Sequence, residues 1–267
     1  DRVLWEVFSN ENASKVRNIR YQYEIEMAEK EVEYQKKLLQ ETEKLILNIL
    51  PKAIVDELRA KGKVKPVYYE SASVLFTYFA GFTKISTSLE PEKIVAELDH
   101  SFSEFDAIVK KYGLEKLKTI GDGYMAVAGV PTAFPDHTFK CVMAALEMRD
   151  FIISLMDSRT EDDIIWDIRI GINTGAIVAG IIGNNKFAYD IWGNTVNVAS
   201  RMESSGVKGE VNISDDTYQE IKKYFDCISK GKINVKGKGP VKMYLVKNLK
   251  PEYAKTGLKP DQRGGVA

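Results

Sequence analysis

Residues 73–83 read SVLFTYFAGFT. The β-branched and aromatic residues in the first part of this stretch predict a strand over 72–79. Gly81-Phe82-Thr83 then turns the chain into a helix. Backbone N–H groups at such a strand-to-helix junction form a site for an anion such as phosphate. An ordinary structural turn explains the same residues equally well, so this stretch alone indicates a mixed fold and a candidate anion site.

The composition is that of a globular protein with balanced charge. The chain has 267 residues, 44% of them hydrophobic, which suits one large domain with an extension. Basic and acidic residues both number 38, so nothing favours nucleic acid as a partner. The two cysteines, Cys141 and Cys227, fit a reducing compartment and a cytoplasmic location. The missing starting Met and signal peptide indicate a piece of a longer protein, whose attachment to a membrane stays open.

The first 50 residues predict a long helix. Residues 21–50 contain no Gly or Pro, and apolar residues recur there at every seventh position, which is typical of a coiled coil. The second apolar column carries two polar residues, so the seam that pairs two chains should be weak. A solvated helix with one apolar edge is the alternative. The first column consists of Ile25, Val32, Leu39 and Ile46, and the second of Ala28, Gln35, Thr42 and Ile49.

Pro51 ends this helix, and a short linker helix is expected within 51–66, over 52–61. The remainder predicts an α+β fold over 67–250, a ferredoxin-like βαββαβ sandwich, followed by a flexible tail over 251–267. We expect the last helix to be capped by Ser214. Strands are expected over 72–79, 114–120, 124–130, 166–172, 177–182, 211–214, 233–235 and 243–246, and helices over 91–112, 137–156, 196–203 and 215–224.

Three further clusters carry side chains suited to a nucleotide. Asp122 lies between two glycines, where it could present a carboxylate to a hard metal ion or simply close an Asp-Gly turn. Asn197 and Arg201 are four residues apart and share a helical face, which suits a ribose and a phosphate or an ordinary surface pair. Lys236 and Lys238 alternate with glycines in a cationic loop or a solvated hairpin tip.

Taken together, five motifs resemble those of class III nucleotidyl cyclases. The resemblance covers residues 50–250. It implies an adenylyl cyclase that converts ATP to 3′,5′-cyclic AMP and pyrophosphate in intracellular signal transduction. It also implies a homodimer with active sites at the interface, two Mg²⁺ or Mn²⁺ ions per site, and an upstream sensor domain. The motifs are FTYFAGFT (76–83), EKLKTIGDGYM (115–125), RIGINTG (169–175), YDIWGNTVNVASRM (189–202) and INVKGKG (233–239).

The resemblance assigns the metal and phosphate groups of one chain. Asp122 matches the second metal-binding aspartate of the family, and Tyr78 stands at the position of the first. The backbone carbonyl of Phe79 would also contact a metal ion. Phe82 and Thr83 would offer backbone N–H groups to the phosphates.

Other positions match residues that surround the rest of the nucleotide. Arg169 matches an arginine that contacts the polyphosphate. From the partner chain, Asn197 would orient the ribose, Arg201 would stabilise charge on the α-phosphate, and Lys236 would bind the terminal phosphates.

The choice of base follows from Lys118 and Asp190, which fall at the two positions that read the purine in the family. Adenine offers an acceptor at N1 and a donor at N6, which a lysine donor and an aspartate acceptor complement. Guanine presents the opposite pattern, and guanylyl cyclases of this family usually carry Glu and a small residue such as Cys there. The pair therefore predicts ATP as the substrate.

Tyr78 departs from the family pattern. A neutral phenol with a pKa near 10 cannot replace a bridging carboxylate, so activity should be strongly impaired. Three interpretations stay open: an introduced substitution in a competent cyclase, a natural change that leaves a nucleotide-binding regulatory and dimerisation module, and one half of a heterodimer whose partner supplies intact aspartates. The retained Asp122, Asn197, Arg201 and Lys236 favour the first.

Overall fold

The computed structural model describes residues 2–82, 86–87, 90–158, 167–183, 186–235 and 239–254. The chain divides into two compact units, Asp1–Val55 and Asp56–Ala267, which are described separately. None of the helices in the described ranges combines the length and the apolar character needed to cross a membrane.

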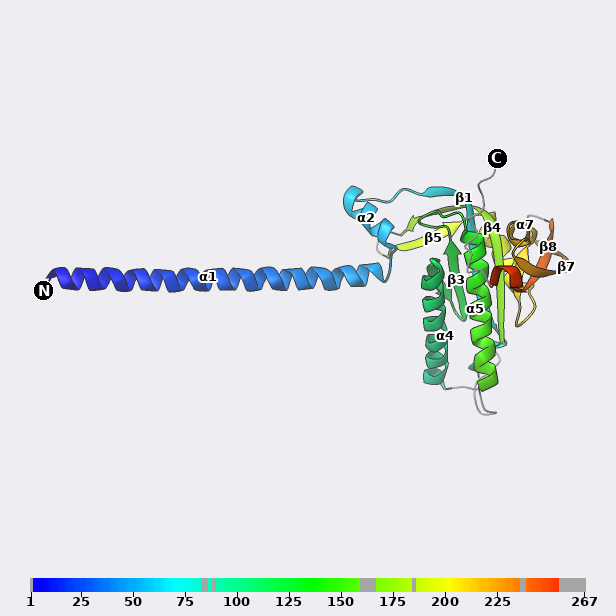
Figure 1. The fold of residues 1–267 in the computed structure, drawn as a ribbon, viewed down its shortest axis with the longest axis horizontal. Coiled ribbons are helices and arrows are strands. Elements are labelled where there is room, and N and C mark those ends of the chain that lie inside the picture. The colour runs from blue at the N-terminus through cyan, green and yellow to red at the C-terminus, as the bar shows by residue number, and fades with distance from the viewer. Residues whose placement is uncertain are drawn as a thin grey trace. The chain divides into compact units, whose positions relative to one another are not determined.

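The first unit consists mainly of one continuous helix, α1 (Arg2–Leu47), drawn in blue in Figure 1. The helix ends at Leu47, four residues before Pro51, and α2 (Lys52–Lys61) follows at the predicted bounds. Val32 and Leu39 of the heptad column are 68% and 63% exposed. A single chain therefore leaves the middle of this column uncovered, and its pairing with a second chain stays a prediction.

The described part of the second unit forms an eight-stranded sheet in the order β2-β3-β1-β4-β6-β8-β7, with β5 paired to β4. In chain order, β1-α4-β2-β3-α5-β4 is the predicted βαββαβ arrangement, and its strands lie in the order β2-β3-β1-β4. The strands are β1 (Val67–Ala80), β2 (Glu115–Ile120), β3 (Gly123–Ala128), β4 (Asp167–Ile182), β5 (Ala188–Trp192), β6 (Val211–Ser214), β7 (Phe225–Val235) and β8 (Gly239–Leu249). The helices of this unit are α4 (Pro91–Tyr112), α5 (His137–Ser158), α6 (Asn194–Ser204), α7 (Asp215–Ile221) and α8 (Pro251–Ala254), in addition to most of α2.

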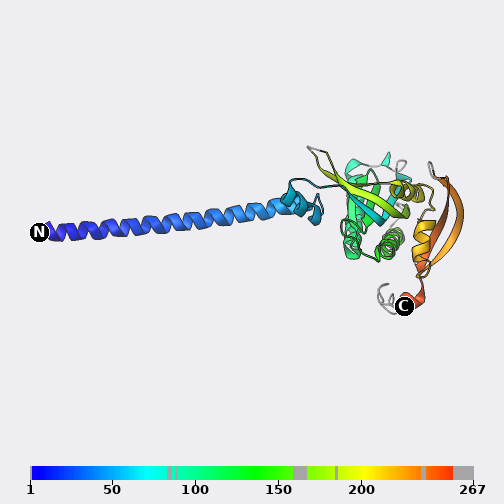
Figure 2. The same cartoon turned by 90° about the horizontal axis from the view of Figure 1, so that it is seen from above.

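The main core lies between the sheet and the helices α4 and α5, which run side by side in Figure 1 and are seen nearly end-on in Figure 2. Phe79 of β1 contacts Phe105 of α4 with ring centroids 6.3 Å apart. Tyr124 of β3 meets the same Phe105 edge to face at 5.6 Å. Buried aromatic pairs of this kind stabilise the core beyond their area alone, and they anchor the ends of β1 and β3 that carry the candidate site.

The opposite face of the sheet is covered by α6. Ile168 and Ile170 of β4 belong to the core under α4 and α5. Because side chains alternate along a strand, Arg169 and Gly171 face the other way, towards α6. A Cβ placed on Gly171 would lie 2.0 Å from the backbone nitrogen of Glu203 on α6. The position therefore requires glycine, and α6 is held in one place along β4.

Gly171→Ala should lower the free energy of unfolding by about 3 kcal/mol, because the backbone of α6 would have to move away from β4. Urea denaturation measures the loss. Gly180→Ala on the same strand is the matched control, since its nearest new neighbour would be Pro66 at an ordinary 3.4 Å. Equal stability of the two variants would show that α6 is not fixed against β4.

The expected break in a strand at residues 173–175 is wrong, because β4 is continuous through them. The polar residues that predict a turn are paired inside the fold. The side chain of Asn173 donates to the carbonyl of Thr195 at 3.0 Å, and Thr174 bonds to Ser73 at 2.8 Å. Tertiary hydrogen bonds thus replace those that a turn would have made.

Other bounds differ at the C-terminal side. The predicted cap of α7 is confirmed, since Ser214 Oγ accepts from the backbone N–H of Thr217 at 3.2 Å. The helix ends at Ile221 rather than at residue 224, because the chain enters β7 at Phe225. Strands β7 and β8 are longer than predicted, and β5 was not predicted. Trp166, expected in a strand, lies outside the described residues.

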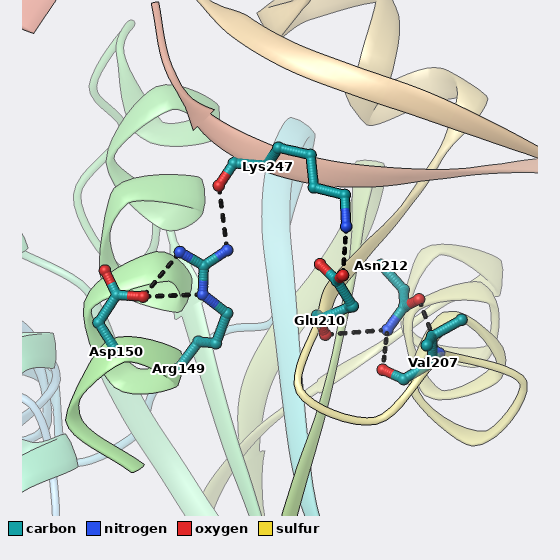
Figure 3. Close-up of polar contacts among 6 residues, drawn as sticks. All are labelled: Arg149, Asp150, Val207, Glu210, Asn212 and Lys247. Carbon is teal, nitrogen blue, oxygen red and sulfur yellow. Dashed lines mark hydrogen bonds and ion pairs between the residues drawn. The ribbon is translucent and has the colours of Figure 1, made fainter. Parts of the chain in front are cut away.

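Figure 3 shows a polar network that ties α5 to β8 and to the loop before β6. Arg149 of α5 pairs with Asp150 at 2.7 Å and donates to the backbone carbonyl of Lys247 at 3.0 Å. The ammonium group of Lys247 pairs with Glu210. The side chain of Asn212 donates to the carbonyls of Ile170 and Glu210 at 2.9 and 3.1 Å. This network is structural, and the candidate site lies elsewhere on the sheet.

Candidate active site

The candidate site is centred on Tyr78, near the end of β1. Tyr78 is paired with Gly123 of β3 on one side and with Arg169 of β4 on the other. Asp122 stands in the turn between β2 and β3, immediately before Gly123. Three strands thus bring together the two metal positions and the polyphosphate arginine that were predicted from separate motifs.

The Tyr78 phenol is held in its protonated form. Its pKa is raised above the usual 10, chiefly by a hydrogen bond to Asp122 and then by burial and by the charges of Asp122 and Glu203, which Arg169 opposes. The guanidinium carbon of Arg169 lies 5.6 Å from the centre of the Tyr78 ring, within the range of a cation–π contact. Position 78 therefore carries no negative charge at neutral pH.

Asp122 is a buried carboxylate with an unsatisfied oxygen. The residue is 5% exposed, and its Oδ2 atom has no hydrogen-bond partner within the described part of the chain. Burial raises the pKa of this carboxyl, while the hydrogen bond to Tyr78, a hydrogen bond to its own backbone and the charge of Arg169 oppose the rise. Leaving a buried acceptor unpaired is costly. The arrangement is typical of an oxygen that is completed by a cation or a donor from a ligand.

The donors at this place do not fit two divalent ions. The side chains present are the carboxylate of Asp122 and the neutral phenol of Tyr78, and the backbone carbonyl of Phe79 stays a predicted third donor. Within the described ranges, no three His, Cys, Asp or Glu side chains gather closely enough to hold a metal ion. The unpaired Asp122 oxygen fits one cation. Mg²⁺ is usually held by one or two carboxylates together with waters and substrate phosphates, so a pair of ions would have to share the single carboxylate of Asp122.

Arg169 is held by a residue that sequence reasoning missed. Its Nε donates to Oε1 of Glu203 at 2.9 Å. Glu203 is 8% exposed. Burial raises the pKa of its carboxyl, and the hydrogen bond and charge of Arg169 oppose this rise. The signal that could have found it is an acidic residue only two positions after Arg201, on a helix that the sequence does predict.

The two residues expected to read the purine are brought into contact. Lys118 on β2 forms an ion pair with Asp190 on β5. The other carboxylate oxygen of Asp190 accepts from the backbone N–H of Ile191 at 2.9 Å, which fixes the orientation of the carboxylate. A donor and an acceptor thus lie next to each other, although Lys118 and Asp190 are 72 positions apart in the sequence.

The remaining predicted residues lie in different surroundings. Asn197 and Arg201 are exposed on α6, while Val198 and Met202 of the same helix are buried. Arg169, and not Arg201, is among the groups that oppose the rise in the pKa of Asp122. Within the described part of one chain, no hydrogen bond or ion pair joins Asn197 or Arg201 to the cluster around Tyr78.

The end of β1 is fixed by aromatic packing. The ring of Phe79 stacks on Phe102 with centroids 5.9 Å apart, which holds the backbone that carries its carbonyl. Phe82 is half-buried against the same core. Thr83 and Lys236, both predicted phosphate contacts, lie outside the described residues.

Comparison with known proteins gives consistent matches. The family model described as the adenylate and guanylate cyclase catalytic domain matches residues 64–248. An adenylate cyclase of Mycobacterium tuberculosis is 41% identical over 206 residues, which are 77% of this chain and 46% of that protein. The human guanylate cyclase soluble subunit beta-2 is 36% identical over 228 residues, which are 85% of this chain and 36% of that protein. The chain thus spans about half the length, or less, of these curated relatives.

Solved structures agree with this result. The adenylyl cyclase CyaB from P. aeruginosa is 33% identical with a TM-score of 0.67, covering 70% of this chain and 98% of that one. The catalytic core of a rhodopsin-guanylyl cyclase with converted specificity, in complex with ATPalphaS, is 39% identical with a TM-score of 0.65, covering 69% of this chain and 98% of that one. The chain belongs to the family of adenylate and guanylate cyclase catalytic domains.

Proposed function

We propose that this chain is the catalytic region of an adenylyl cyclase whose turnover is suppressed by Tyr78. It would convert ATP to 3′,5′-cyclic AMP and pyrophosphate in intracellular signal transduction. It would work as a homodimer joined by the catalytic unit and the coiled coil of α1, under an upstream sensor domain. The relatives include both adenylate and guanylate cyclases, so the family alone does not decide the base.

The observation that carries the proposal is the contact between Lys118 and Asp190. It places one donor and one acceptor side by side, as the edge of adenine requires. When the nucleotide enters, the ammonium group would turn to N1 and the carboxylate would accept from N6. Guanine would face a donor with its own N1–H and an acceptor with its O6, so both contacts would be repulsive.

The other residues would bind and orient the reacting groups. Arg169 would contact the polyphosphate, with Phe82, Thr83 and Lys236 as further phosphate contacts. In the reaction, the ribose 3′-oxygen would form a bond to the α-phosphorus and pass its proton to solvent water, while the bond from the α-phosphorus to the bridging oxygen breaks and pyrophosphate leaves. Negative charge develops on the α-phosphate, where the guanidinium of Arg201 would stabilise it.

The phosphate end of the site supports an impaired rather than an intact enzyme. Members of this family generally use Mg²⁺ or Mn²⁺, and this chain retains Asp122 and the Phe79 carbonyl as donors. The protonated phenol of Tyr78, stacked under Arg169, replaces the other carboxylate. The same observation favours a second candidate function, a nucleotide-binding regulatory module or the half of a heterodimer.

The base preference can be tested in a Tyr78→Asp background. Adding Lys118→Glu and Asp190→Cys should lower the ratio of the rate with ATP to the rate with GTP by about a hundredfold. Two hydrogen bonds to adenine are lost, and the new side chains suit the N1–H and O6 of guanine instead. Cyclic AMP and cyclic GMP are measured at equal nucleotide concentrations. Lys116→Glu is the control, since Lys116 lies on the same strand but pairs with Asp106. An unchanged ratio would contradict base selection by this pair.

A further inference from the structure

Glu203 is a buried carboxylate that pairs with Arg169. It lies near the end of α6 and is 8% exposed, although a glutamate on a short surface helix is normally solvated. Burying an ionised carboxylate is costly unless it is paired, and its partner is the Nε of Arg169 at 2.9 Å. A neutral side chain would cover the sheet at lower cost, so the charge requires an explanation other than packing.

Arg169 is held from two directions. Glu203 accepts its Nε–H, and the Tyr78 ring lies 5.6 Å from its guanidinium carbon. The guanidinium group has five N–H donors in a planar fork, and the contact with Glu203 needs one of them. The Arg169 side chain keeps 23% of its surface exposed, so it can meet a ligand while it is held.

The backbone fixes Glu203 relative to Arg169. Gly171 lies two residues after Arg169 on β4 and therefore on the same face. The backbone of α6 at residues 202–203 passes so close to Gly171 that a Cβ there would lie within 2.0 to 2.6 Å of it. Glu203 consequently has no freedom to slide along β4, and its carboxylate stays beside the guanidinium.

We propose that Glu203 is the positioning residue of Arg169, holding its guanidinium in the orientation that receives the polyphosphate of the nucleotide. This inference rests on the proposed function, because it takes the phosphates of ATP as the ligand of Arg169. Glu203 touches no nucleotide itself and acts through the arginine. Removing the Glu203 carboxylate should therefore weaken the binding of the phosphates and leave the recognition of base and ribose unchanged.

The test compares two competitors of one fluorescent probe on the full chain. The probe is an ATP analogue labelled on the ribose, and ATP or adenosine displaces it. Glu203→Gln keeps the shape but loses the charge, so the Kd for ATP should rise about tenfold, as expected for a lost charge-assisted hydrogen bond. The Kd for adenosine should change less than about twofold, because Lys118 and Asp190 are unaffected. Glu210→Gln, which removes the ion pair with Lys247 shown in Figure 3, should change neither.

The outcomes separate this inference from the function on which it rests. Equal losses for ATP and adenosine, or no loss for either, would overturn the role of Glu203. If the unmodified chain binds no ATP and its Tyr78→Asp variant makes no cyclic AMP, the proposed function falls as well. Should Glu203→Gln reduce folding yield, Glu203→Asp keeps the charge on a shorter side chain. It should show a smaller loss, again for ATP and not for adenosine.

Discussion

Tyr78→Asp should raise cyclic AMP production from ATP by about 10³-fold over the unmodified chain, since restoring a lost metal ligand is worth several kcal/mol of barrier. The physical reason lies in charge. The phenol of Tyr78 is protonated and its pKa is raised further by the hydrogen bond to Asp122. Aspartate at this position, with Asp122 and the Phe79 carbonyl, would supply the two carboxylates that divalent ions require.

The measurement is product formation from Mg-ATP and Mn-ATP by both chains side by side. Tyr78→Phe is the matched control, because it keeps the ring under Arg169 and removes only the hydroxyl group, and it should stay as inactive as the parent. If Tyr78→Asp folds and binds ATP but forms no cyclic AMP, the chain is a regulatory module or the half of a heterodimer. A parent chain that is already fast would show instead that position 78 needs no carboxylate.

Much of the fold is predictable from local sequence signals. The bounds of α4, Pro91–Tyr112, follow from its apolar periodicity, from proline at its first position and from Gly113, which adopts a φ of 71° just after it. The cap of α7 follows from Ser214. These signals act within a few residues, so no knowledge of the tertiary structure is needed to read them.

The errors fall where distant contacts override local preferences. Asn173 and Thr174 would favour a turn, but in the folded chain they bond to Thr195 and Ser73. The strand β4 therefore continues through them. Strand β5 is short, and its residues form part of a motif that was interpreted for its ligand contacts rather than for its alternating burial. A sequence pattern does not reveal which distant group will satisfy a polar side chain.

The residues of the candidate site also divide into those that sequence motifs identify and one that only the packing reveals. The motifs identify Asp122, Arg169 and the departure at Tyr78, because each lies in a conspicuous stretch of sequence. The role of Glu203 depends on the close approach of α6 to Gly171, which brings together residues 34 positions apart. That pairing follows from packing and is visible only in three dimensions.

A mixture of two inactive chains should form active sites. The double variant Tyr78→Asp with Arg201→Ala has a restored metal half but lacks the arginine on α6. The unmodified chain has an impaired metal half, because of Tyr78, and an intact Arg201. Arg201 is exposed and makes no hydrogen bond or ion pair with Asp122 within the described part of one chain, and the proposed homodimer would bring the two halves together across its interface. Random pairing at equal amounts gives about one quarter of the intact sites of the Tyr78→Asp homodimer, and about one quarter of its activity.

Each chain alone should be nearly inactive, and cyclic AMP should appear only after mixing and re-equilibration of the subunits. In the control, the unmodified chain is replaced by one that also carries Arg201→Ala, so that no pairing provides a complete site and activity should stay absent. If the mixture is inactive while the Tyr78→Asp homodimer is active and exchanges subunits, Arg201 acts on the nucleotide of its own chain. Because the control mixture differs from the first only in lacking an intact Arg201, the difference in activity between them reports whether Arg201 of one chain completes the metal half of its partner.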